Sequence, residues 1–225
     1  MNRLEFVWFT RKQDEEFDHT LFSSCMDICQ IGNVYYWKEL AADMLSGYKY
    51  EYGMISHVLS VFLNDYVVGF VLIRNGKKYI ERIDRKRKRN TTKTPICILE
   101  QKHAWYLELI CTMKGYGKAT LRYVRSTAEH EGIHMITLAS IPSRILWYHS
   151  QGYRLTLTNA EPKEITKDIQ TLLEQNVSFN DIEDVLENDD MIRLLKKVSK
   201  HYLFTSDDRS FMNSIIDGVY MTLIL

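Results

Sequence analysis

The spacing of apolar residues predicts that strands and helices alternate along most of this chain. Short runs rich in β-branched and aromatic residues are typical of strands, and apolar residues three and four apart are typical of helices. Strands are expected at residues 4–9, 57–63, 66–73, 105–111, 134–139, 153–157 and 219–224. Helices are expected at residues 17–31, 34–45, 117–132, 142–151, 162–173, 180–186 and 190–201. The order strand, helix, strand, helix, strand over residues 105–157 predicts some parallel strands with helical crossovers.

A glycine turn joins a buried strand to an amphipathic helix between residues 105 and 128. Gly115 and Gly117 stand in this turn, between Lys114 and Lys118. The first N–H groups of a helix point the same way and lie at the positive end of its dipole, so such a turn favours anions. The sequence therefore predicts a site for a phosphate-bearing ligand at this turn.

The strand before the turn carries one carboxylate, Glu108, among apolar residues. Strict alternation places Tyr106, Glu108 and Ile110 on one side of the strand, opposite Trp105, Leu107, Leu109 and Cys111. A carboxylate in apolar surroundings is expected to have a raised pKa, which suits a general base. A buried ion pair would explain the same residue equally well.

Three motifs in order resemble the acetyl-coenzyme A binding half of the GNAT superfamily of N-acetyltransferases. They are the turn Gly115-Tyr116-Gly117, the pair Trp147-Tyr148 and the pair Gly152-Tyr153. The resemblance implies a mixed, mostly antiparallel central sheet of seven strands with flanking helices. It also implies transfer of an acetyl group from acetyl-coenzyme A to a primary amine of a protein or small molecule.

This chain departs from the family pattern at the turn. Thr112 stands where the family has an arginine or glutamine, and the loop before the glycines is shorter than usual. Lys114 and Lys118 are then the expected cations for the pyrophosphate. The resemblance assigns the coenzyme to Leu109, Ile110, Cys111, Thr112, Met113, Lys114, Gly115, Tyr116, Gly117, Lys118 and Ala119. The segment SIPSR after the fifth strand also lacks the asparagine often found there.

Two catalytic residues follow from the same resemblance. Tyr148 is the expected general acid, because a phenol with a pKa near about 10 suits a departing thiolate. Glu108 is the expected base, and a backbone N–H at Ile110 or Cys111 is the expected oxyanion donor. Tyr148 could instead be a core aromatic residue, and Cys111 could suggest an acetyl-enzyme. Because no base for Cys111 is identifiable, direct attack by the amine is the simpler interpretation.

The predicted single domain of residues 1–225 contains two insertions. Residues 75–103, between the third and fourth strands, include five consecutive cations at residues 85–89. This run would suit a nuclear import signal, nucleic acid or an acidic partner, but it lacks interleaved aromatic residues, so a solvated loop is the favoured interpretation. Residues 161–213, before the last strand, are expected to form a helical cap. Residues 161–190 hold ten acidic and two basic residues. We expect this cap to select the acceptor or to bind a protein partner.

Composition bounds the remaining possibilities. The chain has 225 residues, 45% of them hydrophobic, and 29 basic residues balance 29 acidic ones. Zero net charge argues against a general nucleic-acid binder. No stretch reaches the roughly 18 apolar residues of a membrane span, and no signal peptide is evident. We therefore expect a cytoplasmic location, or a nuclear one if residues 85–89 direct import. The four cysteines show no paired spacing, which fits a reducing compartment.

Two patterns suggest a metal without supporting one. His130 to His134 reads HEGIH, but Gly132 falls where the pattern changes from helix to strand, whereas a zinc peptidase needs both histidines on one helix. Cys25 and Cys29 could form half of a site, but no second half is visible, so packing is the favoured interpretation. We expect no metal. The alternative to an enzyme is a GNAT-like interaction or regulatory protein that binds coenzyme A or a partner without efficient turnover.

Overall fold

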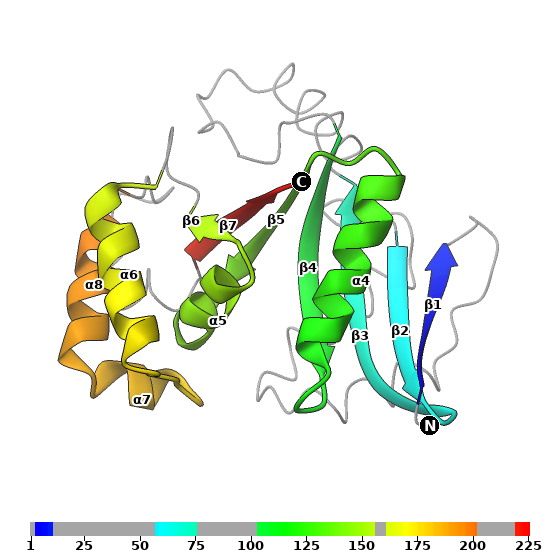
Figure 1. The fold of residues 1–225 in the computed structure, drawn as a ribbon, viewed down its shortest axis with the longest axis horizontal. Coiled ribbons are helices and arrows are strands. Elements are labelled where there is room, and N and C mark those ends of the chain that lie inside the picture. Colours follow the sequence, from blue (N-terminus) through cyan, green and yellow to red (C-terminus); the bar gives the residue numbers. More distant parts are fainter. Residues whose placement is uncertain (1–2, 11–56, 76–102, 156–160, 202–218) are drawn as a thin grey trace, which may run out of the picture. The chain divides into compact units, whose positions relative to one another are not determined.

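The computed structural model describes residues 3–10, 57–75, 103–155, 161–201 and 219–225 (Figure 1). Its strands are β1 (Leu4–Thr10), β2 (His57–Leu63), β3 (Tyr66–Asn75), β4 (Ala104–Thr112), β5 (Met135–Ser140), β6 (Arg154–Leu155) and β7 (Val219–Ile224). Its helices are α4 (Gly117–His130), the 3₁₀ helix η2 (Pro142–Arg144), α5 (Ile145–Ser150), α6 (Lys163–Glu174), α7 (Ile182–Leu186) and α8 (Asp189–His201). The strands form one sheet in the order β1-β2-β3-β4-β5-β7-β6.

The structure confirms the predicted fold class. A seven-stranded sheet carries flanking helices, and three helices precede the last strand, as predicted for the insertion. β2 and β7 have the predicted bounds, while the helix predicted for residues 142–151 begins with the 3₁₀ helix η2. The helices predicted at residues 17–31 and 34–45, and nearly all of the basic insertion, lie outside the described residues.

The chain divides into two compact units. The first comprises residues 1–136 with Leu225, and the second comprises residues 137–224. Among the described helices, the first unit holds α4 and the second holds η2 and α5 to α8. In the part of the chain that the structure describes, no helix is long and apolar enough to cross a membrane.

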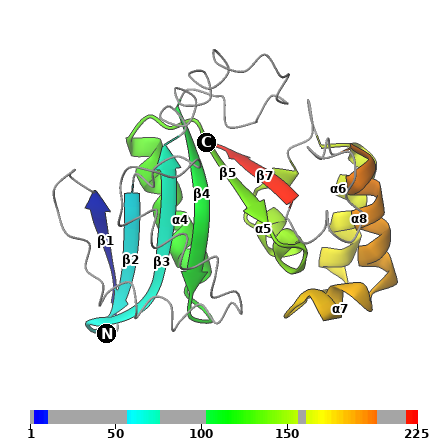
Figure 2. The same cartoon turned by 180° about the vertical axis from the view of Figure 1, so that it is seen from behind.

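The first unit is built on an antiparallel meander of β1 to β4. β1 pairs with β2, β2 with β3, and β3 with β4, all antiparallel. The β2–β3 hairpin turns at Asn64 and Asp65, whose φ angles of 49° and 67° match the primed turns that suit the twist of a hairpin. Helix α4 covers one face of this meander (Figures 1 and 2), where Tyr123 stacks on Phe6 with ring centroids 4.2 Å apart. This contact packs α4 against β1, the first strand of the meander.

β4 contains a bulge that the sequence pattern did not predict. Leu107 pairs with Ile73 and Leu109 pairs with Leu72, so Glu108 is an extra residue on β4 with no counterpart on β3. A bulge of this kind bends the strand and redirects side chains. The strict alternation predicted from Trp105 to Cys111 is therefore wrong, because the side assignments shift at Glu108.

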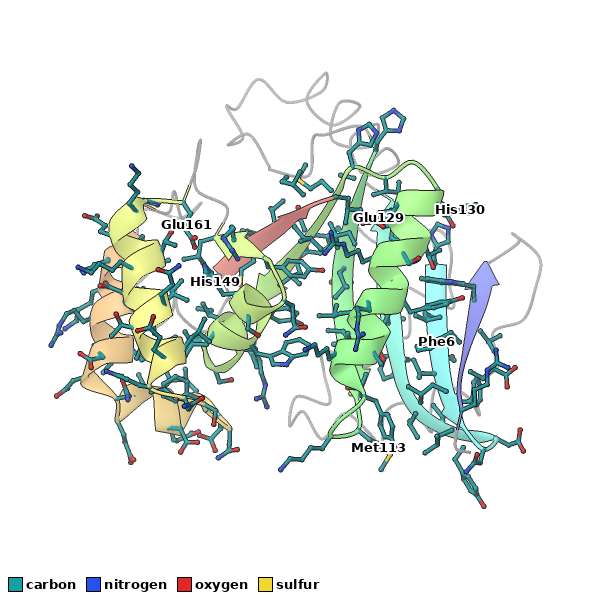
Figure 3. All side chains as sticks on the ribbon, viewed as in Figure 1. Phe6, Met113, Glu129, His130, His149 and Glu161 are labelled. Carbon is teal, nitrogen blue, oxygen red and sulfur yellow. The ribbon has the colours of Figure 1, made fainter. Side chains whose placement is uncertain are left out.

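The end of α4 leads directly into β5. His134 donates its backbone N–H to the carbonyl of His103 at 2.8 Å, so the starts of β4 and β5 lie side by side with α4 as the crossover. His130 is the last residue of α4, and Gly132 follows with a φ of +70° (Figure 3). The two histidines of HEGIH therefore do not lie on one helix. A zinc peptidase requires both histidines of this motif on the same helix.

The second unit holds the helical insertion. α6, α7 and α8 pack through buried apolar side chains, among them Ile165, Ile169, Val185, Leu194 and Val198. Lys197 of α8 forms an ion pair with Asp168 of α6. β6 and β7 pair antiparallel, and the hydroxyls of Thr137 and Thr222 meet at 3.2 Å. The insertion is therefore a packed helical body rather than a linker.

Candidate active site

The turn between β4 and α4 is the most distinctive backbone feature of the first unit. Met113 continues the strand pairing, since its N–H donates to the carbonyl of Val68 at 2.8 Å (Figure 3). The N–H of Tyr116 then donates back to the carbonyl of Met113 at 3.2 Å, which closes the turn. Gly115 has a φ of +98°, a conformation that residues with a side chain rarely adopt. The glycine at this position is thus required by the turn.

α4 begins immediately after this turn, and its first residues leave backbone donors available. Tyr116 is the N-cap and makes no side-chain capping bond, and the first turn holds no acidic residue. The N–H groups of Gly117, Lys118 and Ala119 have no acceptor within the helix, because they lie in its first turn. Lys114 and Lys118 are both exposed beside them. These donors, the helix dipole and two cations favour an anion such as a phosphate.

The predicted coenzyme residues form one continuous segment of the first unit. Leu109 to Thr112 end β4, Met113 to Tyr116 make the turn, and Gly117 to Ala119 open α4. Glu108 lies at the bulge just before this segment and is half-buried. The structure therefore brings the predicted base and the predicted coenzyme segment together in sequence and in space. Tyr148 belongs to the second unit.

Cys111 is not a free thiol in this structure. It is disulfide-bonded. The spacing of the cysteines did not predict this bond at Cys111. A sulfur held in a disulfide is not a thiolate, so it does not supply the nucleophile for an acetyl-enzyme.

Tyr148 lies on the buried side of α5. Its ring packs edge-on against Trp147 and Tyr153, with centroids 4.9 and 5.6 Å away. The side chain is 8% exposed, and its hydroxyl makes no hydrogen bond to any described residue. Burial raises the pKa of the Tyr148 phenol well above its ordinary value, and the nearby charge of Arg144 offsets only part of this rise. The phenol therefore remains neutral at physiological pH.

The sequence prediction missed a buried pair next to Tyr148. Nε2 of His149 on α5 lies 3.2 Å from Oε2 of Glu161, and their side chains are 4% and 5% exposed (Figure 3). Burial raises the pKa of Glu161, but hydrogen bonds from His149, Leu155 and Thr166, with the charge of His149, bring its net pKa below the ordinary value. One feature of the sequence indicated that His149 is buried: it lies on the apolar face of α5, with Ile145, Leu146 and Tyr148.

Comparisons with known proteins return solved structures only. No protein-family model matches the chain, and no curated protein matches it by sequence. GCN5 of Tetrahymena is similar at 11% identity with a TM-score of 0.48, over 98% of this chain and 95% of that one. An acetyltransferase of Bacillus subtilis in complex with coenzyme A is similar at 13% identity with a TM-score of 0.45, over 100% and 99%. The ribosomal-protein-S18-alanine N-acetyltransferase of Escherichia coli is similar at 13% identity with a TM-score of 0.40, over 68% and 79%.

Proposed function

We propose that this protein is an acetyl-coenzyme A dependent N-acetyltransferase that acts on a primary amine of a protein or small molecule. The observation that carries the proposal is the β4–α4 junction. A bulged strand ends in a glycine turn, and the turn opens an uncapped helix flanked by Lys114 and Lys118. The same residues carry the sequence resemblance to the GNAT superfamily. The backbone geometry and the sequence motif therefore both support acetyl-coenzyme A as the ligand.

The coenzyme is proposed to bind along the segment from Leu109 to Ala119. Its pyrophosphate would accept hydrogen bonds from the first N–H groups of α4, and the two lysines would neutralise part of its charge. The pantetheine and the thioester would extend back along Leu109 to Cys111. The bulge at Glu108 lies within β4, just before this segment, and pairing with β3 resumes at Leu109.

The proposed reaction is direct acyl transfer. The amine nitrogen attacks the thioester carbonyl carbon, a backbone N–H of Ile110 or Cys111 stabilises the oxyanion, and the carbon–sulfur bond then breaks. Glu108 accepts the proton that the amine loses, directly or through a water molecule, and Tyr148 donates a proton to the departing thiolate. The products are the acetylated amine and the free thiol of coenzyme A. Burial keeps the Tyr148 phenol protonated, as a proton donor must be, and also makes it a weaker acid than a solvent-exposed phenol.

The helical insertion is proposed to select the acceptor or to bind a protein partner. Its exposed acidic residues on and around α7 include Asp181, Glu183 and Glu187, which favour a basic acceptor. Replacing these three with alanine should lower kcat/KM for polyamines or lysine-rich peptides and leave that for neutral amines unchanged. Equal losses for charged and neutral acceptors would remove this part of the proposal.

A thiol-release assay tests the proposed function. The wild-type protein is incubated with acetyl-coenzyme A and a panel of protein N-termini, lysine peptides, polyamines and small amines, and free thiol is measured over time. We expect amine-dependent release for at least one class. Calorimetric binding of acetyl-coenzyme A without release for any class would instead favour an interaction or regulatory protein that uses the same site.

A further inference from the structure

The carboxylate of Glu161 connects three elements of the second unit. Oε2 accepts hydrogen bonds from Nε2 of His149 on α5 at 3.2 Å and from the hydroxyl of Thr166 on α6 at 2.9 Å. Oε1 accepts from the backbone N–H of Leu155 on β6 at 3.2 Å. Glu161 directly precedes the N-cap of α6, so it stands at the entrance to the helical insertion. One buried carboxylate thus joins the insertion to the helix that carries Tyr148.

α5 depends on such contacts for its orientation. It is six residues long, and a helix of that length does not hold its own conformation without tertiary packing. At its C-terminal end, Arg154 donates a hydrogen bond to the carbonyl of His149 at 3.1 Å. Nε of Arg154 also lies 3.9 Å from Oε2 of Glu161. At its N-terminal end, Arg144 donates to the carbonyls of Phe179 and Asn180 from the insertion. The insertion therefore contacts the C-terminal end of α5 through Glu161. It contacts the turn before α5 through the carbonyls of Phe179 and Asn180.

Tyr148 and His149 are successive residues, so they turn together. Successive side chains on a helix are about 100° apart, and a rotation that frees one moves the other by the same angle. An ionised carboxylate only accepts hydrogen bonds, so Nε2 of His149 carries the proton toward Glu161. With the imidazole fixed in this way, the direction of the neighbouring phenol is fixed as well.

We infer that His149 and Glu161 are a positioning pair, which sets the rotation of α5 and thereby the direction of the Tyr148 hydroxyl during acetyl transfer. This inference rests on the proposed function, because it assigns the pair a role through the proposed acid. Small displacements of a reacting group cost much rate, so a shift of the phenol by about 1 Å is expected to lower kcat by up to about 100-fold.

The first experiment compares Glu161→Gln with Asp168→Asn. Both substitutions remove a carboxylate of an ion pair in the second unit, but Glu161 binds His149 on α5, whereas Asp168 binds Lys197 and joins α6 to α8. In the thiol-release assay, we expect Glu161→Gln to lower kcat at least about tenfold with little change in the KM for acetyl-coenzyme A. Asp168→Asn should keep kcat within about twofold of the wild type. Equal losses in both variants would overturn the inference and leave Glu161 a purely structural residue.

A double-variant cycle tests whether the pair acts through Tyr148. If it does, adding Glu161→Gln to Tyr148→Phe should lower kcat little further, because the group being positioned is already gone. Losses that multiply would contradict the inference. Should Glu161→Gln fail to fold, His149→Gln and His149→Leu serve instead. Glutamine keeps an N–H donor for Glu161, so it should retain more activity than leucine, and equal activities would count against the pair.

Hydrogen exchange separates failure of this inference from failure of the proposed function. If the wild type shows no turnover with any amine, the proposed function fails, but exchange of the α5 amides is still measurable by mass spectrometry. We expect these amides to exchange at least about tenfold faster in Glu161→Gln than in Asp168→Asn, since only the first variant releases α5. Equal exchange in the two variants would show that Glu161 does not fix α5.

Discussion

Gly69 on β3 and Thr112 on β4 are partners across the ladder, and they lie so close that a β-carbon at position 69 would meet Cγ2 of Thr112 at 2.7 Å. The same β-carbon would lie 2.9 Å from the backbone carbonyl of Cys111. Thr112 and Cys111 belong to the segment proposed to bind the coenzyme. The absence of a side chain at position 69 therefore sets the path of β4 as it enters the turn.

Replacing Gly69 with alanine should displace the end of β4. We expect Gly69→Ala to lower the free energy of unfolding by about 1–3 kcal/mol, the usual cost of overpacking, and to weaken acetyl-coenzyme A binding in calorimetry. Adding Thr112→Ser removes Cγ2 and should recover part of both losses, while the carbonyl of Cys111 still crowds position 69. Gly132→Ala is the control, because it strains a positive φ without touching β4. Wild-type binding by Gly69→Ala would contradict the proposed coenzyme path.

The Tyr148 phenol is expected to determine the rate of the chemical step. Tyr148→Phe should lower kcat by about 100-fold or more and change the KM for acetyl-coenzyme A little, because only the proton donor is lost. Because burial raises the pKa of Tyr148, loss of its proton should cause no fall of kcat below about pH 10. Tyr123→Phe, which removes a hydroxyl from α4, is the matched control. Undiminished activity of Tyr148→Phe would contradict the acid role.

The contribution of Glu161 to the free energy of unfolding should be lost at acid pH. Its pKa is lowered in the folded protein, so its contribution is fully present above the ordinary glutamate pKa of about 4.3 and is lost as pH falls through the folded-state value. Near pH 7, Glu161→Gln should lower the free energy of unfolding by about 1–3 kcal/mol, the cost of an impaired buried hydrogen-bond set. Urea unfolding between about pH 5 and about pH 2.5 should show this difference shrinking. A constant difference would mean that the carboxylate charge plays no part.

Much of the fold was predictable because it depends on local patterns. The bounds of β2 and β7 match the apolar runs, and α6 to α8 begin and end within two residues of their predicted limits. The glycine turn was predictable as well, since Gly115 has the positive φ that only glycine adopts readily. These features follow from periodicity and from turn chemistry, both of which are visible in one strand or one helix.

The parts that were missed depend on pairing between distant segments. The bulge at Glu108 exists only in the register of β4 against β3, so a period-two pattern on β4 alone does not show it. Glu161, the partner of His149, is twelve residues away and lies beyond β6. The sequence alone therefore showed only a histidine on the apolar face of a helix, and not the pair. The disulfide of Cys111 was missed for the same reason, because cysteine spacing does not determine connectivity.

Calorimetric titration of acetyl-coenzyme A tests the central claim most directly, with the wild type compared with the double variant Lys114→Gln/Lys118→Gln. Both lysines are exposed, so the double substitution should leave the fold intact and raise the Kd by about 5- to 30-fold, as expected for two lost phosphate contacts. Arg122→Gln, an exposed cation on the next turn of α4, should bind like the wild type. We predict saturable binding at one site that weakens only in the lysine variant. A wild type that does not bind, or a lysine variant that binds equally well, would contradict the assignment of the β4–α4 junction as the coenzyme site.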